Sequence, residues 1–182
     1  KAALLGISSA GAAQGRRAPV MVSGTIEPMG TMLAGQTAEA LWVSLEHAEL
    51  LSIGLNCATG PEFMTDHIRS LAGLSHRYIS CYPNAGLPNE DGKYGETPAS
   101  LAHQLERFVH NGWVNLIGGC CGTTPAHIEA LAAMAAGKAP RRRPAPSPRA
   151  FFSGIEVIEA DDATRPLIVG ERVEEVEAGL EV

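Results

Sequence analysis

The sequence is poor in the features that accompany binding to nucleic acids. It holds 14 Lys and Arg residues against 20 Asp and Glu residues, which leaves a formal net charge of −6. Only 5% of its residues are aromatic. A basic face for a phosphate backbone and an aromatic platform for stacking bases are therefore both lacking. We expect no nucleic-acid partner.

Long apolar runs are also missing. No run of about 18 apolar residues is present to span a bilayer. The apolar start, KAALLGISSAGAAQG, carries a single Lys, is broken by Gly and Ser, and leads directly into a strand pattern. We therefore expect a cytoplasmic protein with no membrane partner. Four cysteines in 182 residues are too few for a disulfide scaffold, so in a reducing compartment we expect thiols or metal ligands.

What the sequence does contain is the composition of a globular domain with a sizeable core, because 45% of its residues are hydrophobic and 19% are charged. Apolar segments of strand length alternate four times with segments of helical period. Strands are expected at 18–26, 50–57, 77–86 and 113–122, and helices at 37–50, 61–74, 97–112 and 123–137. This alternation predicts an α/β fold with a parallel sheet.

The predicted helices carry recognisable start and stop signals. The third has Thr97 as its N-cap, Pro98 at its first position and Gly112 as its stop, and the fourth repeats Thr before Pro and ends at Gly137. The second is expected to begin at Pro61, because proline suits a first helical turn.

The composition changes after residue 137. Residues 138–150, KAPRRRPAPSPRA, hold four prolines and five basic residues, which predicts a solvated linker that packs neither as a helix nor as a central strand. The tail, 151–182, contains one more strand-like run, PLIVGERV at 166–173, and ends in an acidic stretch. The predicted organisation is a first unit at 1–137, the linker at 138–150 and a tail too short for a domain of its own.

Chemically active side chains stand where three of the predicted strands end. Cys57 ends one strand, Asn84 follows another, and Cys120 and Cys121 end the last in GGCCGTTP. Since the carboxyl ends of parallel strands meet at one rim, three thiols and an amide should converge there. A catalytic zinc site typically takes three protein ligands and leaves one position open, which this set would supply.

Simpler interpretations of the cysteines remain open on the residues alone. Cys120 and Cys121 would also suit a pair of packed or redox-active thiols, and Cys81 within its strand is expected to be a small core residue. The histidines on the predicted helices are expected to be solvated or packed.

Three motifs bear on the choice between a zinc site and packed or redox-active thiols. In order along the chain they are GLNCATGPE, YPNAGLPN and GGCCGTTPAHI. Together they resemble the homocysteine-binding module of the cobalamin-dependent methionine synthases. VMVSGTIEPMGTMLAGQTAEALWVSLEHAE supports the same resemblance, and RPLIVGERV after the linker looks like the opening strand of a pterin-binding domain. The resemblance covers about residues 18–173.

The resemblance implies a homocysteine methyltransferase in which Cys57, Cys120 and Cys121 hold a catalytic zinc. Asn84 matches an Asn on the neighbouring strand, which makes it a candidate for substrate binding or for the fourth ligand when substrate is absent. Methylcobalamin would be the methyl donor and methyltetrahydrofolate would recharge it, each on a domain outside this chain. After GERV this chain continues as EEVEAGLEV, where the family would continue into a pterin-binding loop, so no folate-binding residue is implied.

The same resemblance implies that the chain is the second half of a TIM (β/α)8 barrel, followed by the linker and the tail. Homocysteine, the missing barrel half and the cobalamin and folate domains are then the expected partners, and the fragment alone is expected to be inactive. Apolar residues such as Val20, Ile53, Ile79 or Leu116, or their alternating neighbours, are expected to face the missing half.

Two other functions are compatible with the sequence. One is a single-domain zinc homocysteine methyltransferase that uses betaine or another small donor, although such an enzyme has no need for the strand in RPLIVGERV. The other is an inactive remnant that binds zinc or a partner without turnover.

Overall fold

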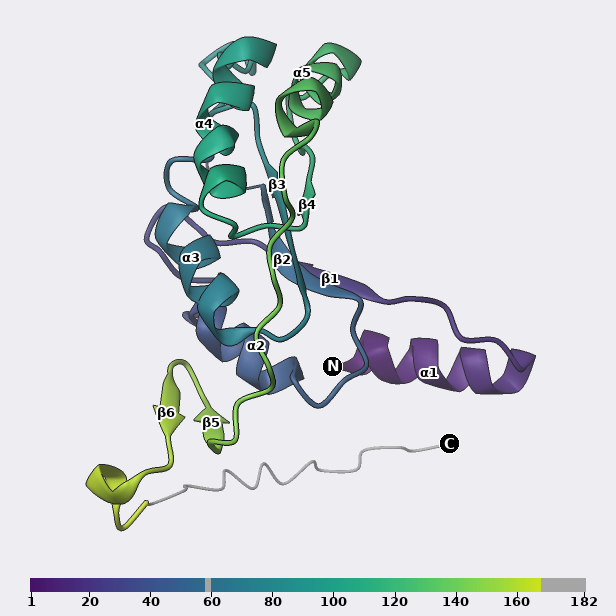
Figure 1. The fold of residues 1–182 in the computed structure, drawn as a ribbon, viewed down its shortest axis with the longest axis vertical. Helices are drawn as coiled ribbons and strands as arrows, with labels where there is room; N and C mark the ends of the chain where they lie inside the picture. Colours follow the sequence, from purple (N-terminus) through teal and green to yellow (C-terminus); the bar gives the residue numbers. More distant parts are fainter. Residues whose placement is uncertain (58–59, 168–182) are drawn as a thin grey trace, which may run out of the picture.

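A computed structural model describes residues 1–57 and 60–167 (Figure 1). Its centre is a four-stranded parallel sheet in the order β1-β2-β3-β4. The strands are β1 (Met21–Gly24), β2 (Ser52–Cys57), β3 (Tyr78–Pro83) and β4 (Leu116–Ile117). The helices are α1 (Ala2–Gln14), α2 (Ala38–Leu45), α3 (Thr65–Leu74), α4 (Pro98–His110) and α5 (Pro125–Ala135). The predicted α/β fold with parallel strands alternating with helices is confirmed.

The sheet does not close on itself in the described residues, because β1 and β4 each pair with a single neighbour. Its order and parallel register fit part of a (β/α)8 barrel. Figure 1 shows α1 beside the end of the sheet, where it contributes no buried residue, whereas α2 to α5 stand along the strands. Among the described residues, no helix is both long and apolar enough to cross a membrane.

The predicted helix caps are largely confirmed. The Thr97 side chain accepts a hydrogen bond from the Ser100 amide, and Pro98 begins α4. The predicted start of the second helix, at Pro61, was wrong, because α3 begins at Thr65. Residues 61–64 form a turn instead, in which the Met64 amide donates to the Pro61 carbonyl. The last strand is also much shorter than predicted, since the glycine-rich stretch after Ile117 leaves the ladder.

The core lies between the sheet and the helices. Ile53, Leu55, Ile79 and Cys81 alternate along the two central strands and are each fully buried. They pack against residues of α3 and α4, which include Ile68, Leu71, Leu101, Leu105 and Phe108. Burial of each large apolar side chain stabilises the fold by about 1.5 to 3 kcal/mol.

The opposite face of the sheet is more polar and mixes small with large side chains. Successive strand residues point to opposite faces, so this face carries Ser23, Ser52, Gly54, Asn56 and Ser80 together with Met21, Tyr78, Tyr82 and Leu116. The Ser23 hydroxyl donates to the Asn56 side-chain oxygen at 2.6 Å. The sequence left open whether Ile53 and Ile79 or their alternating neighbours face the inside, and the structure selects the neighbours, because Ile53 and Ile79 pack on the helices.

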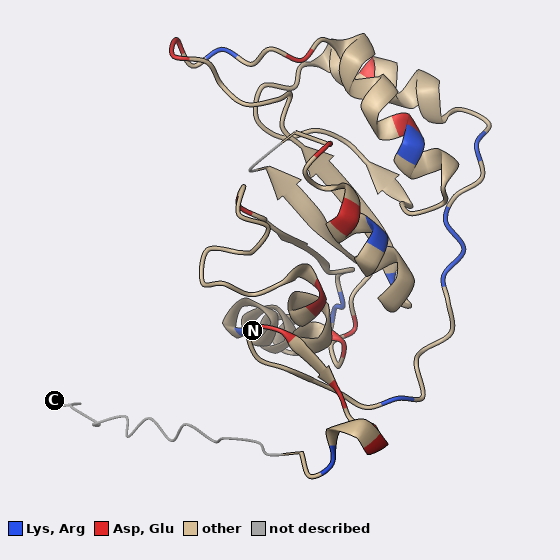
Figure 2. Ribbon diagram, turned by 90° about the vertical axis from the view of Figure 1, so that its left-hand side faces the viewer, with Lys and Arg blue, Asp and Glu red and all other residues tan. Residues whose placement is uncertain are grey.

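The linker is held against the protein, contrary to the predicted solvated tether. Arg141 is 4% exposed, and its guanidinium donates hydrogen bonds to the carbonyls of Ala72, Ser75 and Arg77. Figure 2 shows the basic residues of this segment along the ribbon of the linker. The neighbouring linker residues form neither helix nor strand, as the prolines predict.

A short hairpin follows the linker and was not predicted. Its strands are β5 (Phe151–Ser153) and β6 (Val157–Glu159), which pair antiparallel and pack on α2. At its tip the Ile155 carbonyl accepts a hydrogen bond from the Thr37 amide at 3.0 Å, just before α2. A single 3-10 turn, η1 (Asp162–Thr164), comes next. Most of the run PLIVGERV lies outside the described residues, so the predicted strand there stays a prediction.

Candidate metal centre

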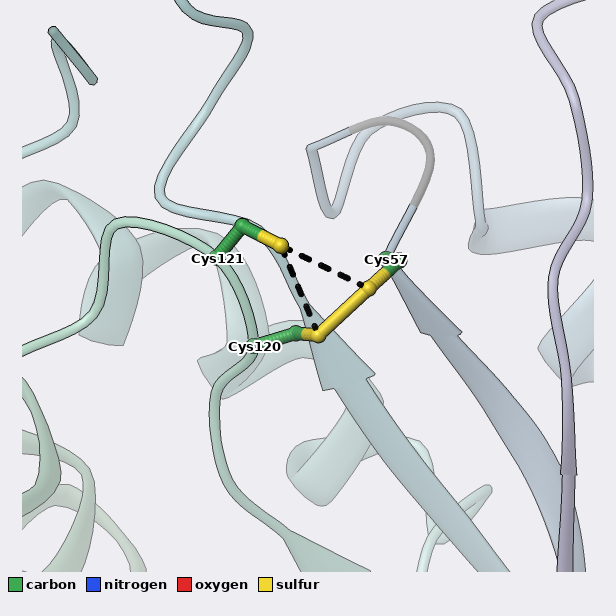
Figure 3. A group of neighbouring side chains, drawn as sticks. All are labelled: Cys57, Cys120 and Cys121. Carbon is green, nitrogen blue, oxygen red and sulfur yellow. Dashed lines mark hydrogen bonds between the residues drawn. A yellow bond between two sulfur atoms is a disulfide. The ribbon is translucent and has the colours of Figure 1, made fainter.

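Three cysteines meet at the carboxyl-terminal rim of the sheet (Figure 3). Cys57 is the last residue of β2, and Cys120 and Cys121 lie in the loop between β4 and α5. Cys121 Sγ is 3.7 Å from Cys57 Sγ and 3.9 Å from Cys120 Sγ. All three sulfur atoms lie within 4.8 Å of one another, so this cysteine cluster is a group that could hold a metal ion.

The structure joins two members of the cluster as a disulfide. Cys57 is bonded to Cys120 with their Cα atoms 5.6 Å apart, a separation that ordinary disulfides have. Cys121 remains a free thiol. The sequence led us to expect that the cysteines are thiols or metal ligands, whereas the structure shows Cys57 and Cys120 as a disulfide. Convergence of three sulfurs on one small volume suits a disulfide as well as a metal, because both need the sulfur atoms close together.

Cys57 reaches the cluster through an unusual backbone conformation. Its φ is +57°, and it is the single non-glycine residue with positive φ among the described residues. This left-handed region is costly for a residue with a side chain, and such conformations gather at functional sites. The bend ends the regular alternation of β2 at the point where the side chain must turn toward Cys120 and Cys121.

The loop that carries the other two cysteines is hydrogen-bonded to the end of β3. The Cys120 amide donates to the Pro83 carbonyl at 2.9 Å, and the Ala85 amide donates to the Cys121 carbonyl at 2.9 Å. The Thr123 hydroxyl closes the loop by donating to the Cys120 carbonyl at 2.7 Å. Main-chain bonds therefore fix both cysteines relative to the strand that separates β4 from β2.

Glycine is required in this loop for space. A Cβ on Gly119 would lie 2.3 Å from the side chain of Thr123. Gly122 has φ of +79°, and a Cβ there would lie 2.2 Å from Tyr94. The flanking glycines thus let neighbouring side chains lie directly on the cysteine-bearing backbone.

Asn84 lies immediately under this loop. It is 6% exposed, and its side-chain oxygen accepts a hydrogen bond from the Cys121 amide at 3.0 Å. The structure therefore brings the predicted Asn84 beside the cluster, with its oxygen bonded to the backbone. Its proposed part in substrate or metal binding stays a prediction.

His127 was not singled out by the sequence as part of this region. Its Nδ1 accepts a hydrogen bond from the Thr124 amide at 3.1 Å, which identifies Nε2 as the protonated nitrogen that donates to the Glu96 carbonyl at 3.0 Å. The side chain is 6% exposed and ties the start of α5 to the loop between β3 and α4. The signal was the capping pattern TTPAH, in which His stands three residues after the N-cap.

Tyr94 is a second contact that the sequence did not reveal. It lies in the same β3–α4 loop and covers Gly122, the residue after Cys121. Partial desolvation raises the pKa of Tyr94, and the charge and hydrogen bonding of the Cys121 sulfur raise it further. No local pattern in the sequence links residues 94 and 121, because the contact depends on how two loops fold over the rim.

Cys81 stands apart from the cluster. It is fully buried in the core, and burial raises the pKa of its thiol far above the ordinary range. The prediction that Cys81 is a small core residue is confirmed.

Comparison with known proteins identifies the family. Structures of the homocysteine methyltransferase MmuM from Escherichia coli are similar to this chain. The oxidized form aligns with a TM-score of 0.52 and 25% identity over 71% of this chain and 40% of that chain. The apo form aligns with a TM-score of 0.51 and 25% identity over 72% of this chain and 44% of that chain. The metallated form aligns with a TM-score of 0.48 and 26% identity over 71% of this chain and 40% of that chain.

The chain thus spans 40% to 44% of the length of these three structures. A family model described as homocysteine S-methyltransferase matches residues 1–135, which carry the whole parallel sheet and the cysteine cluster. On this match, the chain belongs to the homocysteine S-methyltransferase family.

Proposed function

We propose that this chain supplies the zinc-binding, thiol-activating part of a homocysteine S-methyltransferase that makes methionine. One observation carries the proposal: in a chain of this family, Cys57, Cys120 and Cys121 bring three sulfur atoms to one point on the rim.

The geometry of the sulfurs supports zinc. Ligand sulfurs about 2.3 Å from a tetrahedral zinc lie about 3.8 Å from one another. The two non-bonded sulfur separations in the cluster are 3.7 and 3.9 Å. Cys57 and Cys120 must first be reduced, because a disulfide offers no thiolates. After reduction, a modest separation of these two sulfurs would complete a three-thiolate site.

The residues of the chain would then act as follows. Zinc bound there would lower the pKa of the homocysteine thiol and so supply a thiolate nucleophile at neutral pH. Three cysteine thiolates bring three negative charges against two positive ones, which keeps the substrate sulfur electron-rich. The backbone bonds from Pro83 and Ala85 hold the cysteine loop in place, so little reorganisation is needed when substrate arrives.

For the methyl donor we propose methylcobalamin, recharged from methyltetrahydrofolate on other domains. The support is the sequence resemblance to cobalamin-dependent methionine synthases, including RPLIVGERV after the linker. We further propose that the other half of the barrel supplies the groups that hold the amino and carboxylate ends of homocysteine, so that this chain alone is inactive. The second candidate is a single-domain enzyme that uses a small donor such as betaine, because the similar structures are homocysteine methyltransferases that align with 71% to 72% of this chain.

Metal content after dialysis tests the zinc site. The reduced protein is loaded with zinc, dialysed and compared with Cys121→Ala and Cys81→Ala. Cys121→Ala should lose most of the zinc, since one of three thiolates is gone, and Cys81→Ala should retain it, because Cys81 lies in the core. Equal zinc losses in the two variants would refute the ligand assignment.

Methyl transfer separates the remaining alternatives. The zinc-loaded chain, alone and with the complementary half of the barrel, is incubated with homocysteine and either methylcobalamin or betaine. Methionine from methylcobalamin supports the proposal, and methionine from betaine alone supports the second candidate. If neither donor yields methionine with both halves present, the result would favour the alternative that the chain is an inactive zinc-binding remnant.

A further inference from the structure

Four consecutive hydrogen bonds join the cysteine-bearing loop to the loop between β3 and α4. The Thr124 amide donates to His127 Nδ1 at 3.1 Å, and His127 Nε2 donates to the Glu96 carbonyl at 3.0 Å. The Glu96 amide donates to the Ala85 carbonyl at 3.0 Å, and the Ala85 amide donates to the Cys121 carbonyl at 2.9 Å. This hydrogen-bond path therefore leaves the cysteine-bearing loop at Thr124 and returns to it at Cys121.

All four bonds of the path run in the same direction. His127, Glu96 and Ala85 each accept one bond and donate the next, so the bonds polarise and strengthen one another. Ala85 is fully buried and His127 is 6% exposed, which limits the competition of water for these groups. His127 contributes the one side chain of the path, and the other links are main-chain groups. A substitution at His127 can therefore interrupt the path.

The path ends on the backbone of Cys121, which is held on both sides of its Cα atom. The amide donates to the Asn84 side-chain oxygen at 3.0 Å, and the carbonyl accepts from Ala85. These two bonds together fix the direction of the Cα–Cβ bond and so limit where the sulfur can lie. Figure 3 shows this sulfur directed at those of Cys57 and Cys120.

The His127 ring does more than a helix cap requires. In an ordinary capping box, the side chain three residues after the N-cap only has to accept a hydrogen bond from the N-cap amide. The Nδ1 atom fills this role at the start of α5. The bond from Nε2 to the Glu96 carbonyl is additional, and it connects the start of α5 with the loop that holds the Cys121 carbonyl.

We propose that His127 is a positioning residue of the metal centre, which holds Cys121 toward the other two sulfurs through the hydrogen-bond path over Glu96 and Ala85. This inference rests on the proposed zinc site. Cys121 is the exposed member of the cluster and remains outside the disulfide, so its position depends on the backbone that carries it. A ligand that is already in place needs less reorganisation when the metal binds.

Two substitutions of His127 separate the cap from the path. His127→Glu keeps an acceptor for the N-cap amide, as in an ordinary capping box, but an ionised carboxylate has no proton to donate to the Glu96 carbonyl. His127→Gln keeps the acceptor and restores a donor. Ala126→Glu is the matched control for the added charge, because Ala126 is exposed and lies in the same first turn of α5.

Metal binding by the reduced proteins tests the positioning role. Zinc affinity is measured by competition with a chromophoric chelator, and Co²⁺ in place of Zn²⁺ gives a sulfur-to-cobalt charge-transfer band. We expect His127→Glu to weaken zinc binding by about 10-fold and to shift the cobalt band. His127→Gln should recover part of both, and Ala126→Glu should resemble wild type. A residue that only capped α5 would leave affinity and band unchanged in His127→Glu, since the cap is retained.

Amide hydrogen exchange of the metal-free protein tests the path without any metal. In His127→Glu the amides of Glu96 and Ala85, which lie beyond the interrupted link, should exchange about 2- to 12-fold faster, the equivalent of one hydrogen bond. The Ile79 amide, which donates to the Asn115 side chain in the core of the sheet, should exchange at the wild-type rate.

The outcomes distinguish this inference from the proposed function. A wild-type protein that binds no zinc after reduction would overturn the proposed function, whatever the exchange rates. If wild type binds zinc, and His127→Glu shows equal affinity, an unshifted cobalt band and unchanged exchange at Ala85 and Glu96, the role of His127 is refuted and the zinc site stands.

Discussion

Arg141→Ala should destabilise the protein strongly, although Arg141 lies in a proline-rich segment outside every helix and strand. Its Nη2 donates to the Ala72 carbonyl at 2.7 Å and to the Ser75 carbonyl at 2.5 Å, and its Nη1 donates to the Arg77 carbonyl at 2.9 Å. Ala72 and Ser75 are at the carboxyl-terminal end of α3, where carbonyls lack partners within the helix and a cation is favoured.

The magnitude follows from these bonds and the cost that opposes them. A hydrogen bond from a charged donor contributes about 1.5 to 3 kcal/mol, and three carbonyls share this guanidinium. Burial disfavours the charged form, which lowers the pKa of Arg141 and offsets part of the gain. We expect a net loss of about 3 kcal/mol in the free energy of unfolding, which for a chain of this size lowers the melting temperature by about 6 to 12 °C.

Urea unfolding followed by circular dichroism measures this loss. Arg142→Ala is the matched control, since its neighbouring side chain is exposed, and it should remain within about 0.5 kcal/mol of wild type. Arg141→Lys should recover part of the loss, because it restores the charge without the planar fork that reaches three carbonyls. Equal stabilities of Arg141→Ala and Arg142→Ala would show that the segment does not anchor the fold.

Two further predictions concern the rim and its thiols. Gly122→Ala should lower the melting temperature of the reduced, metal-free protein more than Gly137→Ala. Both glycines have positive φ, but only Gly122 has a side chain, Tyr94, in the space a Cβ would take, and equal shifts would argue against that packing. Iodoacetamide at pH 8 should label Cys121 before reduction and Cys57 and Cys120 only after it, while Cys81 stays unlabelled because it is buried and its pKa is raised. Mass spectrometry of the peptides decides this, and early labelling of Cys81 would contradict the core assignment.

Local signals in the sequence were sufficient to predict that α2 to α5 exist and alternate with parallel strands, whereas α1 was not among the predicted helices. Thr97 and Pro98 mark the start of α4 because capping depends on residues three positions apart. The start of α3 was misplaced, since Pro61 fits a first helical turn and a preceding turn equally well. Which face of a strand meets the helices is not a local property. The run SIGLNC alternates between Ile53 and Leu55 on one side and small residues on the other, and only packing decides which side lies inside.

Long-range contacts account for what the sequence could not predict. Arg141 looks solvated among its prolines, and its burial depends on carbonyls that lie 64 to 69 residues earlier in the chain. The hairpin at 151–159 has strands of three residues each, too short to show a period, and it is stabilised by α2. The convergence of the cysteines was predictable because all three follow strand ends, whereas the positive φ of Cys57 and the contact of Tyr94 depend on the folded rim.

The disulfide and the proposed metal site both depend on the short distance between the sulfur atoms of Cys57 and Cys120 at the rim. Cys57 is placed by a bend at the end of β2, and Cys120 is placed by a main-chain bond to Pro83 at the end of β3. The distance between their sulfurs is therefore set mostly by backbone that the parallel sheet fixes. A site fixed in this way cannot hold the disulfide and a three-thiolate metal at once, because bonding Cys57 to Cys120 consumes two of the three ligands. Metal uptake by this protein should consequently require a reductant, and Cys121, which is outside the disulfide, should bind zinc only weakly by itself.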